Sequence, residues 1–504
     1  MGGAGGQRSV QVLPPPRSGV AKDPTQLPST PQSGTAPQQR EQLTGHLGLR
    51  GIFFNVIAYN APISCAAGYL PLVIGLGNGT GAPLSFLVVG VLCLLFSTGF
   101  TAMVPHVGST GAFYAYLRSG LGRPMGLVGA FLAVTTYVAI LAGFLAFGGL
   151  VLGDLVHEVF SGPQLPWWIW SGVMWAGISV LSLFNIDVSA KVLTCLELAL
   201  ILVWELVVAV HEGPSGHAAV AFSPSSFKQG SIGTGLLFAV LCNSGFEAAA
   251  VFRQEARHPD PDVPRATYLT VVFLAVLYSL GAWLFIVSFG THDAVAAGLD
   301  PTGSFASSVG NYLGRVASDA VYVLLATSSF AGVLANQNIA ARYLFALGQD
   351  GELPKRLGKA HPRHRSPVNA ALVVSGTVFV IEAVGAAARL DIVPFYSAFT
   401  GVGSLCLILS MTLVSVAVFG FFRRRRELGV NRWRTIGAPL GAFVGLGAVL
   451  VLATAKLDVL VGSRGTALTL EIVITVIALS GLVLAGYLKA RRPDVYARIG
   501  EQQI

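Results

Sequence analysis

Charged side chains are scarce in this sequence. Asp, Glu, Lys and Arg make up 11% of its 504 residues, whereas a soluble domain carries roughly 25%. Residues 51–117 and 124–153 contain none of these four residue types. A water-soluble fold needs charged groups on its surface. The scarcity therefore excludes a soluble enzyme, with or without a single membrane anchor.

Cysteine is also rare. The five cysteines are far apart, each lies within an apolar stretch, and no CxxC pair occurs. Neither a disulfide framework nor a zinc site is predicted, and we expect no cofactor. The glycine-rich run at residues 75–81 follows no strand, so it does not predict a dinucleotide site. No Walker A loop is present either, which argues against transport driven by ATP.

The first 46 residues differ in composition from the rest of the chain. They contain seven proline, seven glycine and seven glutamine residues and no Phe, Trp or Tyr. Such a segment buries too little apolar surface to offset the entropy lost on ordering. We predict a disordered tail that is either passive or binds a regulatory partner. No signal peptide is expected, because the first apolar run begins near Leu47.

Twelve apolar segments of membrane-crossing length follow the tail. They cover residues 49–77, 83–104, 125–152, 165–184, 188–210, 231–253, 266–290, 317–347, 369–388, 393–422, 435–455 and 467–488. The predicted fold class is an all-α polytopic membrane protein with 12 transmembrane helices.

The positions of the basic residues predict how the segments are oriented. With the amino terminus in the cytoplasm, 27 of the 32 Lys and Arg residues fall on the cytoplasmic side. This asymmetry follows the positive-inside rule, so we predict that both termini are cytoplasmic in a multi-pass plasma membrane protein. The arginine run at residues 423–426 is then a cytoplasmic loop anchor, with a nuclear localisation signal as the weaker alternative. The expected partner of the chain is the lipid bilayer, and no nucleic acid partner is expected.

The first segment contains a candidate break. Pro62 removes a backbone donor and clashes with the preceding turn, and Ser64 and Gly68 are small neighbours. A proline kink without a function is the alternative interpretation, because proline is tolerated in many membrane helices.

The sixth segment contains a second candidate break. Asn243, Ser244, Gly245 and Glu247 lie together near its middle. A charged residue at that depth costs about 2.5–3.5 kcal/mol on insertion scales, so it normally faces a cavity. A neutral, hydrogen-bonded packing role for Glu247 is the alternative.

The two breaks are five segments apart. Because five is odd, segments 1–5 and 6–10 have opposite topology and are able to form an inverted repeat. Secondary transporters bind substrate where such interrupted helices meet. A passive channel is the competing class, although channels favour rings of charges or carbonyls. An intramembrane enzyme needs a catalytic His–Ser or Asp–Asp pair, and none is found within the segments.

Several motifs carry a family resemblance. They are the break at residues 62–68, GAFYAY at 111–116, NSGFE at 243–247, EARHP at 255–259 with VPRA at 263–266, ARYLFALGQDGELP at 341–354 and SPVNA at 366–370. In this order they resemble the amino acid permeases of the amino acid–polyamine–organocation superfamily. The resemblance implies a leucine-transporter-like 5+5 inverted repeat with broken helices 1 and 6. It also implies a transport core at residues 47–430, accessory helices at 431–490 and a cytoplasmic tail at 491–504.

The resemblance also implies where a substrate binds. Backbone N–H groups at the first break would hold an amino acid carboxylate at a positive helix end. Carbonyl groups at the second break would meet the amino group, beside a bulky Phe246 that helps to occlude the site or simply packs. Tyr137 is a further lining candidate. The implied binding residues are Pro62, Ile63, Ser64, Cys65, Ala66, Ala67, Gly68, Tyr137, Cys242, Asn243, Ser244, Gly245 and Phe246.

Coupling to an ion is open among H⁺, Na⁺ and exchange. Thr327, Ser328 and Ser329 offer the hydroxyls of a sodium site, but such groups also serve helix packing. Several proton-coupled or exchanging relatives have a lysine in segment five, and this chain has Glu197 and, nearer the outer face, Glu205 there instead. A buried carboxylate is able to carry a proton. We therefore favour proton coupling, with Glu197 and Glu247 as the candidate carboxyl groups. Neutral amino acids, cationic amino acids and polyamines stay open as substrates.

Overall fold

Helices make up the regular secondary structure of the computed structural model. It describes residues 2, 47–107, 113–183, 190–211, 213–360 and 366–499, and no strand occurs among them. The all-α fold class is therefore confirmed for this part of the chain. The described residues from 47 onward belong to one unit. The tail predicted at residues 1–46 lies outside the described residues, apart from Gly2.

The long helices follow the predicted apolar segments to within a few residues at most ends. They are α1 (Leu49–Asn60), α4 (Ala82–Met103), α6 (Arg123–Asp154), α7 (Trp167–Leu183), α8 (Ala190–Val210), α10 (Ile232–Asn243), α11 (Pro259–Ala297), α13 (Arg315–Asp350), α14 (Val368–Ala387), α15 (Ile392–Arg424), α16 (Ala438–Ala455) and α18 (Arg464–Arg491).

Shorter elements continue or connect these helices. The α-helical ones are α2 (Pro62–Ser64), α3 (Leu70–Leu72), α5 (Phe113–Leu121), α9 (Pro224–Phe227), α12 (Pro301–Leu313), α17 (Leu457–Val461) and α19 (Pro493–Arg498). The π- and 3₁₀-helical ones are η1 (Cys65–Tyr69), η2 (Val73–Asn78), η3 (Gly79–Gly81), η4 (Val104–His106), η5 (Leu155–Val159), η6 (Ala219–Phe222), η7 (Phe246–Glu255), η8 (Arg426–Leu428) and η9 (Trp433–Gly437).

Ten helical stretches in the described ranges are long and apolar enough to cross a membrane. The first, Leu49–His106, runs over 58 residues and contains the first two predicted segments. Helix α7, in the fourth predicted segment, has 17 residues and is not one of the ten. The chain is therefore a polytopic membrane protein, and the count of twelve crossings stays a prediction.

Local sequence signals mark many helix ends. Pro259 and Pro301 are the first residues of α11 and α12, where a missing N–H costs nothing and the fixed φ suits a helix. The hydroxyls of Ser231 and Ser463 cap α10 and α18 by accepting hydrogen bonds from backbone N–H groups three residues on. Such caps satisfy N–H groups that have no partner within the helix, so they place the helix starts in the sequence.

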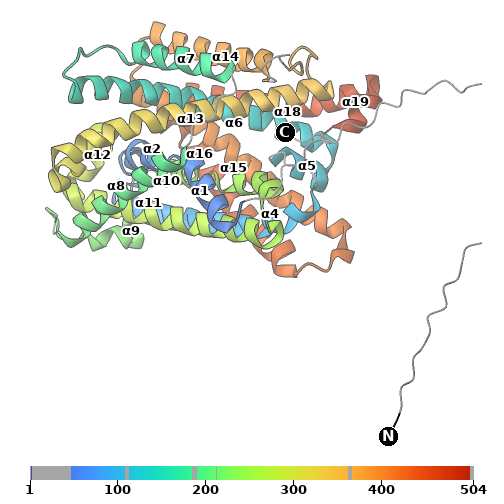
Figure 1. Ribbon diagram of the computed structural model, residues 1–504, viewed down its shortest axis with the longest axis horizontal. Helices are drawn as coiled ribbons and strands as arrows, with labels where there is room; N and C mark the ends of the chain where they lie inside the picture. The colour runs from blue at the N-terminus through green and yellow to red at the C-terminus, as the bar shows by residue number, and fades with distance from the viewer. Residues whose placement is uncertain are drawn as a thin grey trace, which may run out of the picture. The chain divides into compact units, whose positions relative to one another are not determined.

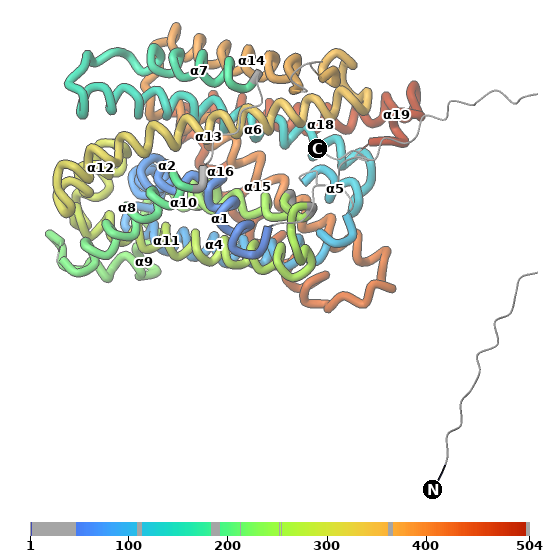
Figure 2. Tube along the Cα trace, viewed as in Figure 1, coloured from blue at the N-terminus to red at the C-terminus, as the bar shows by residue number. Residues whose placement is uncertain are grey.

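The helices pack in two neighbouring groups. In Figure 1, α7 and α14 lie side by side and cover α6 and α13, and the contacts between these helices agree. Helices α1 and α10 lie in the second group, against α11 and α4. Figure 2 shows the same arrangement along the chain trace. Because α10 is buried from Gly233 to its end, one of the two predicted breaks lies in the interior of the protein.

Candidate functional site

The first break lies at Ala61, one residue before the predicted proline. Helix α1 ends at Asn60, and Ala61 adopts a left-handed conformation with φ 53°. Pro62 is the first residue of the next helical turn, a position where its ring is tolerated. The first N–H groups of a helix have no partner within it. The structure thus places such groups at Ile63 and Ser64, at the start of the predicted run.

Residues further along that run serve the helix itself. Cys65 to Tyr69 form the π-helical turn η1, so the backbone groups of Ala66 and Ala67 continue the helix. Gly68 provides room for an aromatic ring, because a Cβ there would lie 2.5 Å from Cζ of Phe147. The hydroxyl of Tyr396 donates a hydrogen bond of 3.1 Å to the Gly68 carbonyl oxygen. Ala66, Ala67 and Gly68 therefore hold the half-helix in position and do not line the cavity described below.

The second break lies where the sequence predicts it. Helix α10 ends at Asn243, Ser244 is extended, and Gly245 has φ 101° before the 3₁₀ helix η7 begins. A non-glycine residue rarely adopts such a positive φ. The Gly245 N–H donates a hydrogen bond of 2.9 Å to Oε2 of Glu247. The Glu247 carboxyl group therefore supports the break from inside the same turn.

Asn60 joins the two breaks, and the sequence analysis did not single it out. Its amide Nδ2 donates to the carbonyl oxygens of Cys242 and Ser244 at 2.7 and 2.9 Å. The Tyr278 hydroxyl donates in turn to Oδ1 of Asn60. Two carbonyl groups expected to face a substrate thus have a side-chain donor in this structure. A polar amide directly before the Ala-Pro pair was the available signal.

A cavity of about 70 Å³ lies between the breaks. Four of the predicted residues line it, namely Cys65, Tyr137, Ser244 and Glu247. The other lining residues are Tyr59, Asn60, Ala61, Tyr69, Thr136, Ile140, Phe144, Leu241, Asn336 and Leu407. Drug-sized ligand pockets measure roughly 300–1,000 Å³, so this conformation leaves little space between the two half-helices.

Aromatic side chains line much of this space. The ring of Tyr137 stacks on Tyr343 with centroids 5.5 Å apart, and the Tyr137 hydroxyl hydrogen bonds to that of Tyr59. The rings of Tyr69 and Phe144, which also line the cavity, lie 6.1 Å apart. Rotation of these side chains would change the cavity volume even if the helix backbones stayed in place.

The side chains of two residues that were expected to face a substrate at the second break point away from the cavity. The ring of Phe246 packs edge-on against Phe96 with centroids 6.0 Å apart, and it does not line the cavity. The side chain of Asn243 donates to the Ala239 carbonyl oxygen at 3.0 Å, within its own helix. Both are buried, so packing explains their positions here.

A second polar cluster lies behind the first break. Oε2 of Glu197, on α8, accepts a hydrogen bond of 3.4 Å from the Ile63 N–H. The Ser64 hydroxyl donates to that of Ser328 on α13 at 3.2 Å, and the Ser328 hydroxyl also hydrogen bonds to Glu197. Glu197 is 1% exposed. Three separate helical segments thus meet at one buried carboxyl group.

The neighbours of Ser328 do not reach this cluster. The side chain of Thr327 is exposed and bonds back to the Val323 carbonyl oxygen at 2.9 Å. Ser329 is buried and lies beside Gly148 of α6. Of the three predicted hydroxyls, only that of Ser328 contacts the first break. Gly111 and Ala112 of the GAFYAY motif lie outside the described residues.

The structure defines a class of protein at this point. It is a polytopic α-helical membrane protein in which two interrupted helices meet around a small, partly polar cavity. Residues 62–493 match the model of the amino acid permease family. The chain therefore belongs to this family within the amino acid–polyamine–organocation superfamily, as its motifs indicated. Members of this family are transporters and not enzymes.

Individual relatives are distant in sequence. The aromatic amino acid transport protein AroP of Escherichia coli O6:H1 is 23% identical over 393 residues, which are 74% of this chain and 82% of AroP. The branched-chain amino acid permease BcaP of Bacillus subtilis is 24% identical over 321 residues, which are 57% of this chain and 64% of BcaP. The low-affinity putrescine importer PlaP of Escherichia coli K12 is 20% identical over 428 residues, which are 83% of this chain and 90% of PlaP.

Proposed function

We propose that this permease is a secondary active transporter that carries an amino acid or a related amine across the plasma membrane by alternating access. The observation that carries the proposal is the meeting of the two breaks, joined by Asn60 beside the cavity. Non-helical backbone at membrane depth is tolerated only where it is buried in protein or lines a cavity. The relatives that transport amino acids and putrescine support the same substrate class.

The charges of an amino acid suit the two breaks. Its carboxylate would meet the start of the half-helix near Ser64, beside the Ile63 N–H that Glu197 accepts, where the helix dipole is positive. Its ammonium group would meet the Ser244 carbonyl and the Glu247 carboxyl group, both of which line the cavity. Since the cavity measures only about 70 Å³, substrate entry requires the half-helices and the aromatic rings to move apart.

The inverted repeat belongs to the same proposal. Helix α1 with its break begins the first group of five predicted segments, and α10 with its break begins the second group. The ends of these two helices meet through Asn60, which supports a 5+5 arrangement of opposite topology. The 27 of 32 basic residues on one side support cytoplasmic termini. Reporter fusions after Arg123, Arg265 and Arg434 test this orientation, and one external reporter would overturn it.

We assign proton coupling to Glu197. Its carboxyl group accepts the Ile63 N–H at the first break, and no salt bridge reaches it in the part of the chain that the structure describes. An ionised carboxylate without a cation partner is costly in a low-dielectric interior. A change in its protonation would therefore act directly on the half-helix that faces the substrate.

Sodium coupling and exchange are the competing mechanisms. The hydroxyls of Ser64 and Ser328 are oxygen ligands of the kind that a sodium site uses, so they favour sodium coupling over exchange. Purified protein in liposomes, given labelled amino acids and polyamines in turn, distinguishes the mechanisms. We expect saturable uptake with counterflow that an inward proton gradient drives and a sodium gradient at clamped pH does not. Uptake without saturation or counterflow would show a passive channel instead.

A further inference from the structure

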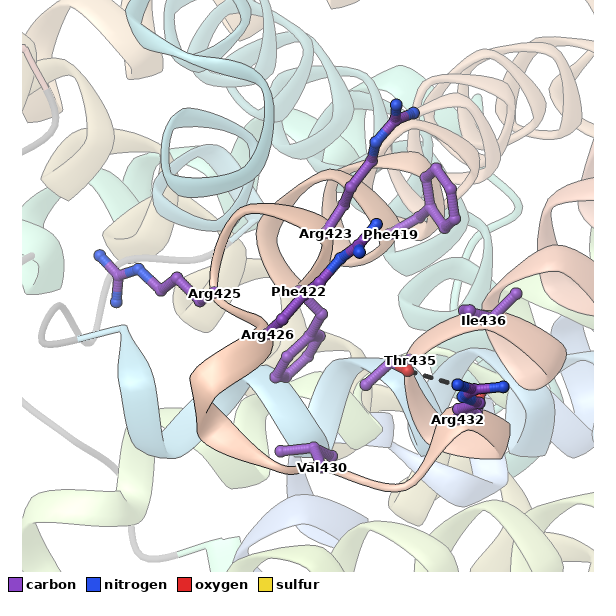
Figure 3. Close-up of a pocket in the computed structure, with 9 residues that line it drawn as sticks. All are labelled: Phe419, Phe422, Arg423, Arg425, Arg426, Val430, Arg432, Thr435 and Ile436. Atoms are coloured by element: carbon purple, nitrogen blue, oxygen red, sulfur yellow. Dashed lines mark hydrogen bonds between the residues drawn. The ribbon is translucent and has the colours of Figure 1, made fainter.

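An arginine-lined cavity lies at the end of α15 and shares no residue with the proposed substrate site. It measures about 530 Å³ and opens where α15 ends and the η9–α16 segment begins (Figure 3). The lining residues are Phe419, Phe422, Arg423, Arg425, Arg426, Val430, Arg432, Thr435 and Ile436. Its volume falls in the range of small-molecule pockets, roughly 300–1,000 Å³.

Among the described residues, no acidic side chain pairs with the positive charge in this cavity. Residues 423–434 contain six arginines and one glutamate, and Glu427 does not line the cavity. Within the described ranges, none of the four lining arginines forms an ion pair. Like charges gathered in a hollow create a potential that attracts an anion.

Three of the arginines border the cavity from the two chain segments on either side of it. The guanidinium group of Arg425 lies over the ring of Phe421 at 4.6 Å, and Figure 3 shows it extending away from the others. The side chains of Arg423 and Arg426 extend in a common direction. Arg432 lies across the cavity, where its carbonyl oxygen accepts the Thr435 hydroxyl. Guanidinium groups bind phosphate in a bidentate manner.

Exposed apolar side chains continue from the cavity along the membrane helices. Phe419 is 42% exposed on α15, and Ile436 and Leu440 are 45% and 58% exposed on η9 and α16. Trp433 is 58% exposed, and tryptophan favours the depth of lipid headgroups. Because α15 and the η9–α16 stretch are long and apolar enough to cross the membrane, these side chains face the bilayer, and the hydrocarbon chains of a lipid whose head enters the cavity would lie along them.

We propose that this cavity binds the anionic headgroup of a phospholipid from the leaflet on the basic, predicted cytoplasmic side. Arg423, Arg426 and Arg432 surround the phosphate, and the acyl chains lie along Phe419, Ile436 and Leu440. Basic clusters directly beside a membrane helix attract anionic lipids. The lipid joins the end of α15 to α16, so it stabilises the packing of these two helices.

The test compares lipids and variants on the purified full chain in neutral detergent. Thermal unfolding is measured with added phosphatidylglycerol, with phosphatidylcholine of the same acyl chains, and with inorganic phosphate. The test variant carries Arg423→Gln, Arg426→Gln and Arg432→Gln. The control variant carries Arg389→Gln, Lys456→Gln and Arg464→Gln, which remove three positive charges on the predicted external side.

Phosphatidylglycerol is expected to raise the unfolding temperature more than phosphatidylcholine does. The test variant should lose at least half of this difference, and the control variant should keep it. Native mass spectrometry should show fewer retained phosphatidylglycerol molecules on the test variant alone. Equal stabilisation by both lipids, or equal loss in both variants, would overturn the proposal. An arginine-dependent shift with inorganic phosphate alone would overturn the lipid assignment and leave an anion site.

Discussion

The side-chain amide of Asn60 donates a hydrogen bond of 2.7 Å to the Cys242 carbonyl oxygen, across 182 positions of sequence. This bond joins the end of α1 to the end of α10. A second bond from the same Nδ2 atom reaches the Ser244 carbonyl oxygen. One side chain therefore fixes the position of the first break relative to the second. Any motion that separates the half-helices must replace these bonds.

Asn60→Ala tests this link. It leaves two carbonyl groups without their side-chain donor, and a buried unsatisfied group costs about 1–3 kcal/mol. We expect the substrate affinity in a liposome uptake assay to fall about tenfold or more, since 1.4 kcal/mol corresponds to a factor of ten. Asn336→Ala is the matched control, because Asn336 lines the cavity but bonds only to Gly332 of its own helix. Equal losses in both variants would refute the bridging role.

Glu247 supports a second prediction. Glu247→Ala removes the acceptor of the Gly245 N–H and a carboxyl group that lines the cavity. Transport should be abolished or strongly reduced while membrane insertion persists, because losing a charge favours insertion. Glu247→Gln keeps an acceptor oxygen for the N–H, so it should retain the folded break and separate that role from charge. Normal uptake by well-expressed Glu247→Ala would reduce the residue to a packing role.

The sequence predicts the helices better than the contacts between them. Apolar length and helix-end signals such as Pro259 and Ser463 are local, so most helix ends agree with the structure to within a few residues. The second break was also predictable, because Gly245 is the residue type that a positive φ requires. The sequence analysis predicted the first break one residue too far along the chain. Pro62 marks the start of a half-helix, and the break itself falls on Ala61, which carries no such signal.

Contacts between distant segments explain what the sequence did not predict. Asn60 is significant only because α10 brings two carbonyl groups to it. Of three consecutive hydroxyls on α13, the helix presents only that of Ser328 to the first break. Residues about 100° apart around a helix face different neighbours. The hydroxyl that faces Glu197 is therefore determined by the rotation of α13 about its axis. Packing against other helices sets this rotation.

Glu197→Gln tests proton coupling. The amide keeps an oxygen for the Ile63 N–H but cannot release a proton, so the half-helix should stay in place. We expect counterflow of unlabelled and labelled substrate to persist and accumulation driven by a proton gradient to be lost. Glu205→Gln is the control, since Glu205 is a buried carboxyl residue of the same helix outside the cluster. Accumulation that survives in Glu197→Gln and fails in Glu205→Gln would move the coupling role to Glu205.

Glu352 gives a prediction on stability and pH. Burial, reinforced by Asp350, raises the pKa of this carboxyl group to about 8 from 4.5, although Arg118 opposes the shift. The folded protein therefore binds more protons at this group than the unfolded chain does between these values. The resulting stability is present below pH 4.5 and is lost as the pH rises through about 8. The unfolding temperature in detergent should fall over this window.

Glu352→Gln should flatten that part of the pH dependence, because the amide does not titrate. Glu427→Gln, which alters an exposed side chain, is the control and should leave the wild-type slope in place. Melting curves recorded from pH 5 to pH 9 in one detergent give the comparison. If the unfolding temperature of Glu352→Gln changed with pH as it does in the wild type, groups other than Glu352 would be responsible for the pH dependence.

The glycines at the breaks test where the substrate site lies. Gly245 has φ 101°, and an added Cβ would lie 3.0 Å from Cδ1 of Tyr59, which lines the cavity. A left-handed conformation costs an L-residue about 1–2 kcal/mol, so Gly245→Ala should distort the break and raise the substrate KM about tenfold. Gly245→Val and Gly68→Val should have larger effects, and the latter must also displace the Phe147 ring.

Gly172→Val is the matched control for these variants. A Cβ at Gly172 has nothing within 4 Å, so this substitution in α7 should change neither KM nor abundance. Abundance in the membrane separates a folding defect from a binding defect. The proposed site requires KM to change more than abundance does in Gly245→Ala, because the strain falls on backbone that faces the substrate. If Gly245→Ala and Gly172→Val transported equally well, the substrate would have to bind away from the two breaks.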